Sequence, residues 1–274
     1  SRSDRFDAHG GRRVVVGLRG SYHGLTYGSF ALTGEDLDQR VYGVDQRLVR
    51  HVAHDDISEL RTLLDREGQR VAAVVVEPVL GSGAHALAPE FVDELGKLRL
   101  EHGFLLVADE VATGFGRTGE FFASQNWLVR PDVLVTSKGL TNGTCAASAL
   151  VVSGAVCAAF DEAGSVLMHG ETQAGTPPTC AAILATIDAM RADGVVEQAR
   201  VLSGWLDLAL DELVQTHDAV TTTSGSVGFR AVQLRHHDGT PFDVARCAGV
   251  VDAVRAAGVS VRPGPGCMRL VPGL

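Results

Sequence analysis

Residues 71–108 constrain the fold more than any other part of the sequence. Val71–Val76 is a valine-rich apolar run, too short for a buried helix and typical of a central strand. A helix is predicted next, because Pro89 can occupy a first helical turn and Gly103 can end the helix. A second apolar run at residues 104–108 then indicates another strand. A strand, a helix and a strand in this order form a βαβ unit, so we predict an α/β fold with a parallel sheet.

An acid and an amine stand where two predicted strands end. The first strand leads into Asp109, and the apolar run Val133–Val135 is followed by Lys138. Ligands of open α/β sheets bind at the carboxyl ends of the strands. Lys138 is one of only two lysines in a chain that otherwise uses arginine, the other being Lys97. Schiff-base chemistry with a carbonyl cofactor requires a lysine, and pyridoxal phosphate also requires an acid at its ring nitrogen. Spacing alone does not decide between such a cofactor site and a simpler interpretation, in which Lys138 is a solvated loop residue and Asp109 an ordinary acid at a strand end.

A set of five motifs decides between these interpretations. Together they resemble the class III, pyridoxal-phosphate-dependent aminotransferases, in the family's order and at about its spacing, over nearly the whole chain. Ala112, and the Gly-Thr after the lysine segment, most resemble the diaminopelargonic acid (adenosylmethionine-8-amino-7-oxononanoate) aminotransferases of biotin synthesis. The motifs are SYHGLTYGS (21–29), VVVEPVLGSG (74–83), DEVATGFGRTG (109–119), SKGLTNGT (137–144) and HGETQAGTPPTCAA (169–182).

The resemblance implies the type I fold of pyridoxal-phosphate enzymes. Residues 1–192 would form the cofactor-binding large domain, in which a mainly parallel sheet is sandwiched by helices. Residues 193–274 would form a small C-terminal α/β domain. Against the family pattern the chain looks truncated at both ends, because the N-terminal phosphate loop and a last helix are absent. We therefore expect a fragment of a longer chain that binds the cofactor poorly alone; the alternative is a partner polypeptide that supplies the rest.

The resemblance also assigns roles around the cofactor pyridoxal 5'-phosphate. Lys138 would hold it as an imine and, once released, serve as the base that moves the substrate proton. Asp109 would stay ionised against the ring nitrogen. Tyr22 and Val111 would cover the two faces of the ring, and Thr172 would reach the phosphate of the neighbouring subunit's cofactor.

Three more residues fall in the cofactor-binding motifs: His23, Gly24 and Glu77. Of these, His23 is expected to be structural rather than catalytic. Each assignment has a plainer alternative, since Tyr22 could be a core tyrosine, Glu77 a solvated strand-end acid, and the Thr172 segment a helix cap.

Two arginines near the C-terminus compete for the substrate carboxylate. In ornithine-type members of the family, the arginine at the Arg269 position binds it. In the diaminopelargonate type, the arginine at the Arg262 position does so. The chain has both residues, so the substrate stays open between these types, and either arginine could be a surface residue.

Other features exclude several classes of function. Residues 114–119 fit the pattern G-x-G-x-x-G, but they do not follow a strand directly or open a clear helix, so we reject a dinucleotide site. The formal net charge is −9 and no basic run is present, which excludes nucleic acid. The five cysteines are scattered without metal-ligand spacing, as in reduced cytoplasmic proteins. No apolar run reaches the length of a membrane span.

The leading hypothesis is transamination between an amine or amino acid donor and a keto or aldehyde acceptor. The amino group would lie far from an α-carboxylate, or on a substrate without one. The resemblance favours a homodimer with its active site at the subunit interface. Two alternatives remain: an aminomutase on the same fold, and a non-catalytic subunit that completes a partner's site.

Overall fold

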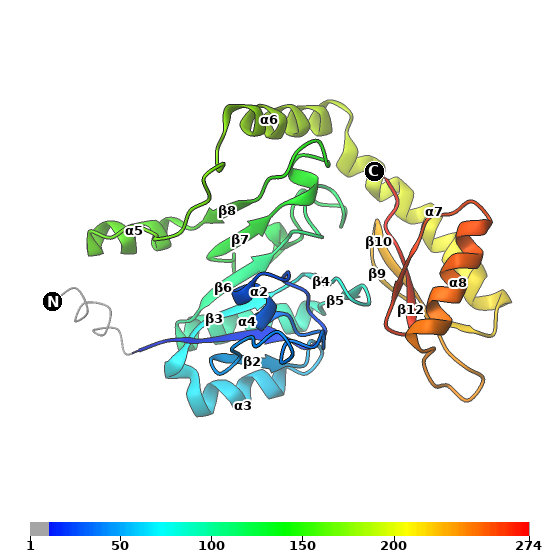
Figure 1. Cartoon of the computed structure of the whole chain (residues 1–274), viewed down its shortest axis with the longest axis horizontal. Helices are drawn as coiled ribbons and strands as arrows, with labels where there is room; N and C mark the ends of the chain where they lie inside the picture. Colours follow the sequence, from blue (N-terminus) through cyan, green and yellow to red (C-terminus); the bar gives the residue numbers. More distant parts are fainter. Residues whose placement is uncertain (1–10, 274) are drawn as a thin grey trace. The chain divides into compact units, whose positions relative to one another are not determined.

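The structure of the chain, a computed structural model, describes residues 11–273 (Figure 1). Residues 1–10 and the last residue, Leu274, lie outside the described residues. The chain divides into two compact units. The first contains residues 1–78, 87–112 and 124–187, and the second contains residues 79–86, 113–123 and 188–274. No sequence pattern indicates that residues 79–86 and 113–123 belong with the C-terminal unit. The predicted domain boundary after residue 192 stays a prediction.

The first unit is built on a six-stranded sheet. The strand order is β2-β1-β3-β6-β7-β8, and all neighbouring pairs are parallel except β7 and β8. This arrangement confirms the predicted α/β fold with a mainly parallel sheet. The strands are β1 (Val14–Leu18), β2 (Val49–Val52), β3 (Val71–Val76), β6 (Leu105–Asp109), β7 (Val133–Thr136) and β8 (Ala149–Val152).

Two helices beside this sheet have clear start and stop signals. The Asp56 side chain caps α3 (Ile57–Glu67) by accepting hydrogen bonds from two backbone N–H groups of its first turn. A proline opens α4 (Pro89–His102), and Gly103 ends it in the left-handed conformation with φ of 70°. Both helices bury leucines at helical spacing, and they pack against one another. A short helix, α2 (Tyr27–Leu32), contacts β1 and β2, and a 3-10 turn, η1 (Gly68–Arg70), leads into β3.

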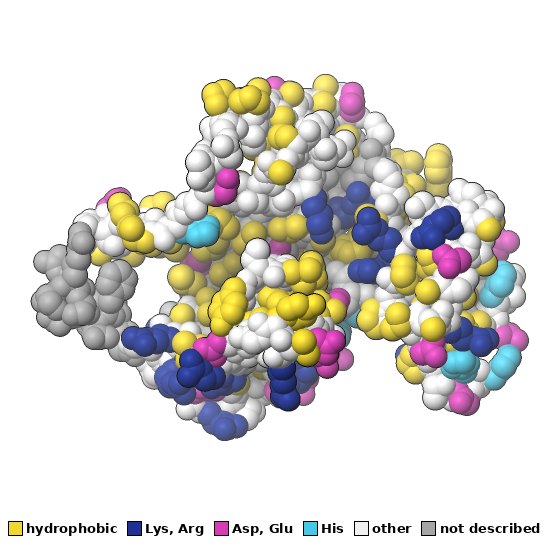
Figure 2. Space-filling view, viewed as in Figure 1, with side chains coloured by type: hydrophobic (Ala, Val, Ile, Leu, Met, Phe, Trp, Pro, Cys, Tyr) yellow, Lys and Arg dark blue, Asp and Glu magenta, His cyan; other side chains and the backbone are white. Residues whose placement is uncertain are grey.

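Apolar side chains are exposed at the β8 end of the first unit. Leu150, Val151 and Val152 are 54%, 56% and 41% exposed, although successive strand residues point to opposite faces. Neither α5 (Gly154–Ala163) nor α6 (Pro177–Ala192) contains a buried residue. Figure 2 shows apolar side chains on the surface of both helices. The edge strand β2, in contrast, carries Arg50 and His51 in its middle.

The second unit is an antiparallel sheet covered by helices. Its sheet order is β11-β12-β10-β9, and a separate hairpin, β4-β5, belongs to the same unit. The core contains mainly aliphatic residues of α7, α8, β10 and β12. Its elements are β4 (Val79–Leu80), β5 (His85–Ala86), α7 (Val195–Thr216), β9 (Val220–Ser226), β10 (Phe229–Leu234), α8 (Val244–Ala256), β11 (Arg262–Gly264) and β12 (Cys267–Leu270).

Arg117 ties two parts of the second unit together. Its guanidinium donates hydrogen bonds from Nη1 to the carbonyls of Gly228, at 3.1 Å, and of Pro272, at 2.5 Å. Burial lowers the pKa of Arg117. The glycine-rich segment that contains it forms turns and is followed by a short 3-10 helix, η2 (Ala123–Asn126), whereas a dinucleotide loop opens an α-helix. Within residues 11–273, no helix has both the length and the apolar character needed to cross a membrane.

Candidate active site

The carboxyl ends of three neighbouring parallel strands carry the polar residues that the sequence singled out. Tyr22 and His23 follow β1, Glu77 follows β3, and Asp109 is the last residue of β6. Because β1, β3 and β6 are adjacent and parallel, their carboxyl ends lie at one edge of the sheet. These residues come from positions up to 87 apart in the chain, so the sheet is what brings them together.

Asp109 and His23 form a direct contact. His23 Nδ1 lies 2.7 Å from Asp109 Oδ2, and the two side chains are only 4% and 10% exposed. The other carboxylate oxygen, Oδ1, accepts a hydrogen bond from the Val111 N–H at 3.1 Å. Asp109 is therefore held from two sides, and its remaining lone pairs are available to a further donor.

Glu77 and Gly24 fix the loop that follows β1. Glu77 is buried and accepts a hydrogen bond from the Tyr22 N–H at 2.8 Å, so its carboxylate is not merely solvated. Gly24 has φ of 108°, and a Cβ there would lie 3.1 Å from Ser29 Oγ. Tyr22 as a whole residue is 39% exposed, which excludes its interpretation as a core tyrosine of this unit.

Lys138 lies one strand away from Asp109. In the register of β6 and β7, Asp109 is opposite Val135, and Lys138 follows three residues later in a 3-10 turn, η3 (Lys138–Leu140). The residue is exposed and has φ of 41°, a left-handed conformation that costs a side-chain-bearing residue free energy. Residues with such strain tend to cluster at functional sites, although turns such as the one at Val227 also contain them. Thr172, by contrast, is exposed between α5 and α6, and within residues 11–273 it forms no hydrogen bond with Asp109 or Lys138.

Arg262 and Arg269 are neighbours in the second unit. They are directly opposite each other in the antiparallel pair of β11 and β12, so their side chains leave the same face of the hairpin. Arg269 donates from Nη1 to the Gly81 carbonyl at 2.6 Å and from Nη2 to the Pro263 carbonyl at 2.9 Å, while its buried Nε has no partner among the described residues. Arg262 is exposed. Directly opposed like charges are destabilising, so this cationic pair needs a reason other than stability.

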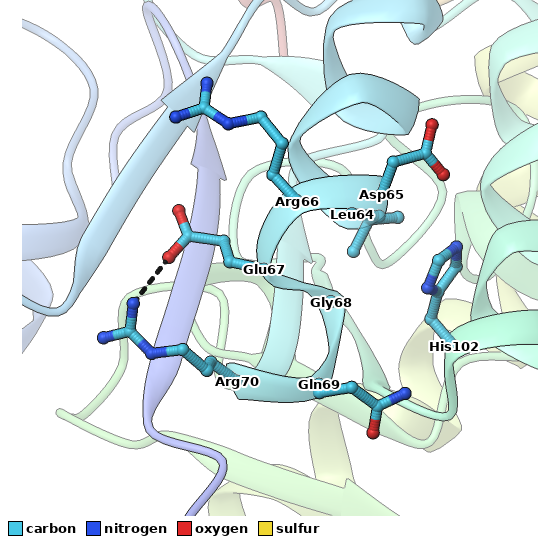
Figure 3. A pocket seen from close by; sticks show the side chains of 8 residues that line it. All are labelled: Leu64, Asp65, Arg66, Glu67, Gly68, Gln69, Arg70 and His102. Carbon is cyan, nitrogen blue, oxygen red and sulfur yellow. Dashed lines mark hydrogen bonds and ion pairs between the residues drawn. The ribbon is translucent and has the colours of Figure 1, made fainter.

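A surface pocket lies elsewhere in the first unit. Figure 3 shows that it is formed by the end of α3, the η1 turn and His102 at the end of α4. These segments precede β3 and β6, so the pocket is at the opposite end of these strands from Glu77 and Asp109. Its charged side chains also bond to each other, as in the pair Arg70–Glu67 at 3.0 Å. We do not assign it to the candidate site.

The comparisons with known proteins agree with this geometry. Residues 2–274 match the profile of the family Aminotransferase class-III. The chain belongs to this family. It is 31% identical to the acetylornithine aminotransferase of Methanothermobacter thermautotrophicus, over 96% of this chain and 64% of the relative. It is 29% identical to an omega-aminotransferase of Caulobacter vibrioides, over 94% of this chain and 63% of the relative. The chain thus spans less than two thirds of these relatives.

A solved structure of an amine transaminase from an uncultivated Pseudomonas species, in its pyridoxal-phosphate-bound form, also resembles the chain. The TM-score is 0.90 at 27% identity, and the similarity covers 99% of this chain and 67% of the other. The class-III resemblance predicted from the motifs is therefore confirmed. The finer resemblance to the diaminopelargonate type has no counterpart among these relatives.

Proposed function

We propose that this chain supports pyridoxal-phosphate-dependent transamination. The observation that carries the proposal is the arrangement of Asp109 and Lys138: a buried carboxylate held from two sides, and a strained lysine just beyond the adjacent strand. The family membership and the cofactor in the Pseudomonas relative support the same conclusion.

The residues present fit the cofactor at three points. The ring nitrogen needs an anion of fixed orientation, and both carboxylate oxygens of Asp109 are already oriented by hydrogen bonds, to His23 and to the Val111 N–H. The aldehyde needs an amine, and the Lys138 amine makes no hydrogen bond or ion pair within residues 11–273. The ring face needs an aromatic surface, and Tyr22 is open to the surroundings.

When bound, the cofactor supplies a ring that accepts electrons from the substrate carbon. Asp109 would keep the proton on the ring nitrogen. Lys138 would hold the cofactor and, once released, move the proton between the substrate carbon and the cofactor carbon, for which its amine must be partly neutral. Val111 would cover the ring face opposite Tyr22, and Gly24 and Glu77 would shape the loop beside it. Thr172 would bind the phosphate of the cofactor in the neighbouring subunit.

We propose that the substrate carries a carboxylate and that Arg269 is the main residue that binds this carboxylate. Two carbonyls orient its guanidinium, and its buried Nε has no partner among residues 11–273. Arg262 is exposed and adds positive charge from the opposite strand. The named relatives support an acetylornithine-like or other omega-amino substrate over the step of biotin synthesis. The aminomutase alternative uses the same residues and differs only in the fate of the amino group.

We further propose a cytoplasmic homodimer, or a complex in which a partner chain contributes residues to the site. A non-catalytic role is disfavoured, because such a chain would have no reason to keep a strained lysine beside an oriented aspartate.

Amino transfer from N-acetylornithine or a simple diamine to a keto diacid tests the proposed activity. Lys138→Arg keeps the charge but cannot form an imine, so we expect it to abolish transfer. Lys97→Arg is the matched control, because Lys97 is 72% exposed and pairs only with Glu94 on the same helix. Full transfer by Lys138→Arg would refute the proposal.

A further inference from the structure

The contact between His23 and Asp109 has a direction that the chemistry of the two groups determines. An ionised carboxylate can only accept a hydrogen bond, so the imidazole must donate from Nδ1 across the 2.7 Å separation. The other ring nitrogen, Nε2, is buried and has no hydrogen-bond partner within the described part of the chain. A buried N–H without an acceptor is costly, so the geometry favours the tautomer with its proton on Nδ1 and a bare Nε2.

The backbone of His23 is fixed by a residue that the motifs did not single out. Thr33, which ends α2, is buried and accepts a hydrogen bond from the His23 N–H on its Oγ1 at 3.0 Å. The same hydroxyl lies 3.0 Å from the Gly24 carbonyl and 3.1 Å from the Ser29 carbonyl, to either of which it can donate. The imidazole therefore approaches Asp109 from a loop with little freedom to move.

We propose that His23 is a positioning residue for Asp109: its Nδ1–H holds the carboxylate in the orientation that a cationic ring nitrogen requires. The inference rests on the proposed function and changes the role predicted for His23, from a residue of the cofactor site to one that acts through Asp109. Preorganisation of this kind matters because a rotating carboxylate would lose electrostatic stabilisation of the cation that it faces.

Substitutions at position 23 separate the hydrogen bond from the shape of the side chain. Asparagine carries its amide nitrogen on Cγ, as histidine carries Nδ1, so His23→Asn can keep the donor to Asp109. Glutamine places its nitrogen one bond further out, near the position of Nε2, and leucine has no donor. His51 provides a matched control, because it is a half-buried histidine whose Nε2 bonds to the Leu32 carbonyl at 2.8 Å. Burial lowers the pKa of His51, so it adds little charge near His23.

The contact is first tested without cofactor. In cofactor-free protein labelled with 15N-histidine, two-bond 1H–15N correlation spectra should show His23 protonated on Nδ1. Asp109→Asn should shift the His23 nitrogen signals and leave those of His51 unchanged. Unchanged His23 signals in Asp109→Asn, or a proton on Nε2 alone, would overturn the inference whatever the protein's activity.

The consequence is then tested in the holo-protein. We expect His23→Leu and His23→Gln to lower kcat about tenfold to a hundredfold, by analogy with metal sites, where loss of a hydrogen-bond partner of a metal ligand has an effect of this size. The KM for the amine should change little, and His23→Asn should recover most of the loss. His51→Leu should keep the kcat of the parent. Equal kcat in all His23 variants, or an equal loss in Asn and Leu, would overturn the inference. Labelling of Lys138 by borohydride in the parent shows separately whether the proposed function holds.

Discussion

Replacement of Arg269 by methionine should affect both the stability of the second unit and the recognition of substrate. Its two hydrogen bonds, to the carbonyls of Gly81 and Pro263, tie β12 to the segment after β4 and to β11. A hydrogen bond from a charged donor contributes about 1.5–3 kcal/mol. The Pro263 carbonyl belongs to an exposed residue, where water can replace the lost donor. Relief of the repulsion from Arg262 returns about 0.2–1 kcal/mol.

The net loss for Arg269→Met is therefore about 0.5–3 kcal/mol of unfolding free energy, which corresponds to a fall in Tm of roughly 2–12 °C for a unit of this size. Arg262→Met removes only the repulsion, so its unfolding free energy should stay the same or rise by up to about 1 kcal/mol. Arg255→Met on the surface of α8 is a suitable control, because its ion pair with Asp252 is exposed.

The kinetic effect is measured as kcat/KM for a keto acid and for its uncharged analogue. Loss of a partly desolvated arginine–carboxylate pair costs about 2–5 kcal/mol, so Arg269→Met should lose discrimination between the two acceptors by a factor of about 30 to several thousand. Arg262→Met should keep most of it. The reasoning is refuted if Arg262→Met loses discrimination while Arg269→Met keeps it, or if Arg269→Met leaves Tm unchanged. If neither variant loses it, the carboxylate is bound elsewhere or the substrate has none.

Three further predictions follow from individual residues. Asp109→Asn should still bind the cofactor but slow the half-reaction with an amine by several powers of ten, about 4 kcal/mol, and near-normal turnover in stopped-flow measurements would show that Asp109 is only a strand-end acid. Burial opposes ionisation of Asp132, but hydrogen bonds from Arg99 and the Leu106 N–H lower its pKa below 3.8. The stability that Asp132 adds should therefore be present above about pH 4 and be lost as the pH falls through its folded pKa. The unfolding free energies of Asp132→Asn and the parent, measured by urea titration, should converge in acid, and a constant difference between them at all pH values would contradict this. Val227 has φ of 48° in the two-residue turn between β9 and β10, so Val227→Asn should raise the unfolding free energy by about 1 kcal/mol. A lower Tm would show that the packing of the Val227 side chain matters more than its backbone strain.

The elements that could be predicted are those in which consecutive residues show the pattern of a buried strand or of a helix start. β3 lies at the predicted Val71–Val76, and α4 begins at the predicted Pro89, because an all-apolar run and a proline at a first turn have few other interpretations. β2 was not predicted, since an edge strand can keep Arg50 and His51 in its middle. β9 was missed because its threonines, serines and glycine do not alternate in hydrophobicity.

In the candidate site, too, some features could be predicted from the sequence and others could not. Asp109 and Lys138 could be placed from the sequence, because each follows an apolar run at the end that binds ligands in α/β sheets. The contact of His23 with Asp109 could not, since it joins residues 86 positions apart and depends on the strand order. The left-handed backbone of Lys138 also has no signal in the residue type. The pairing of Arg262 with Arg269, in contrast, has a signal in the sequence. The turn Pro265-Gly266 is centred between the two arginines and predicts a hairpin that places them opposite each other.

The covalent attachment of the cofactor is the most direct test of the central claim. Borohydride reduction of the holo-protein fixes an imine as a stable secondary amine, and peptide mapping then identifies the lysine. Only Lys97 and Lys138 can carry the label, and Lys97 is on the exposed face of α4. We predict label on Lys138 alone. Label on Lys97, or a bound cofactor that borohydride attaches to neither lysine, would contradict the account.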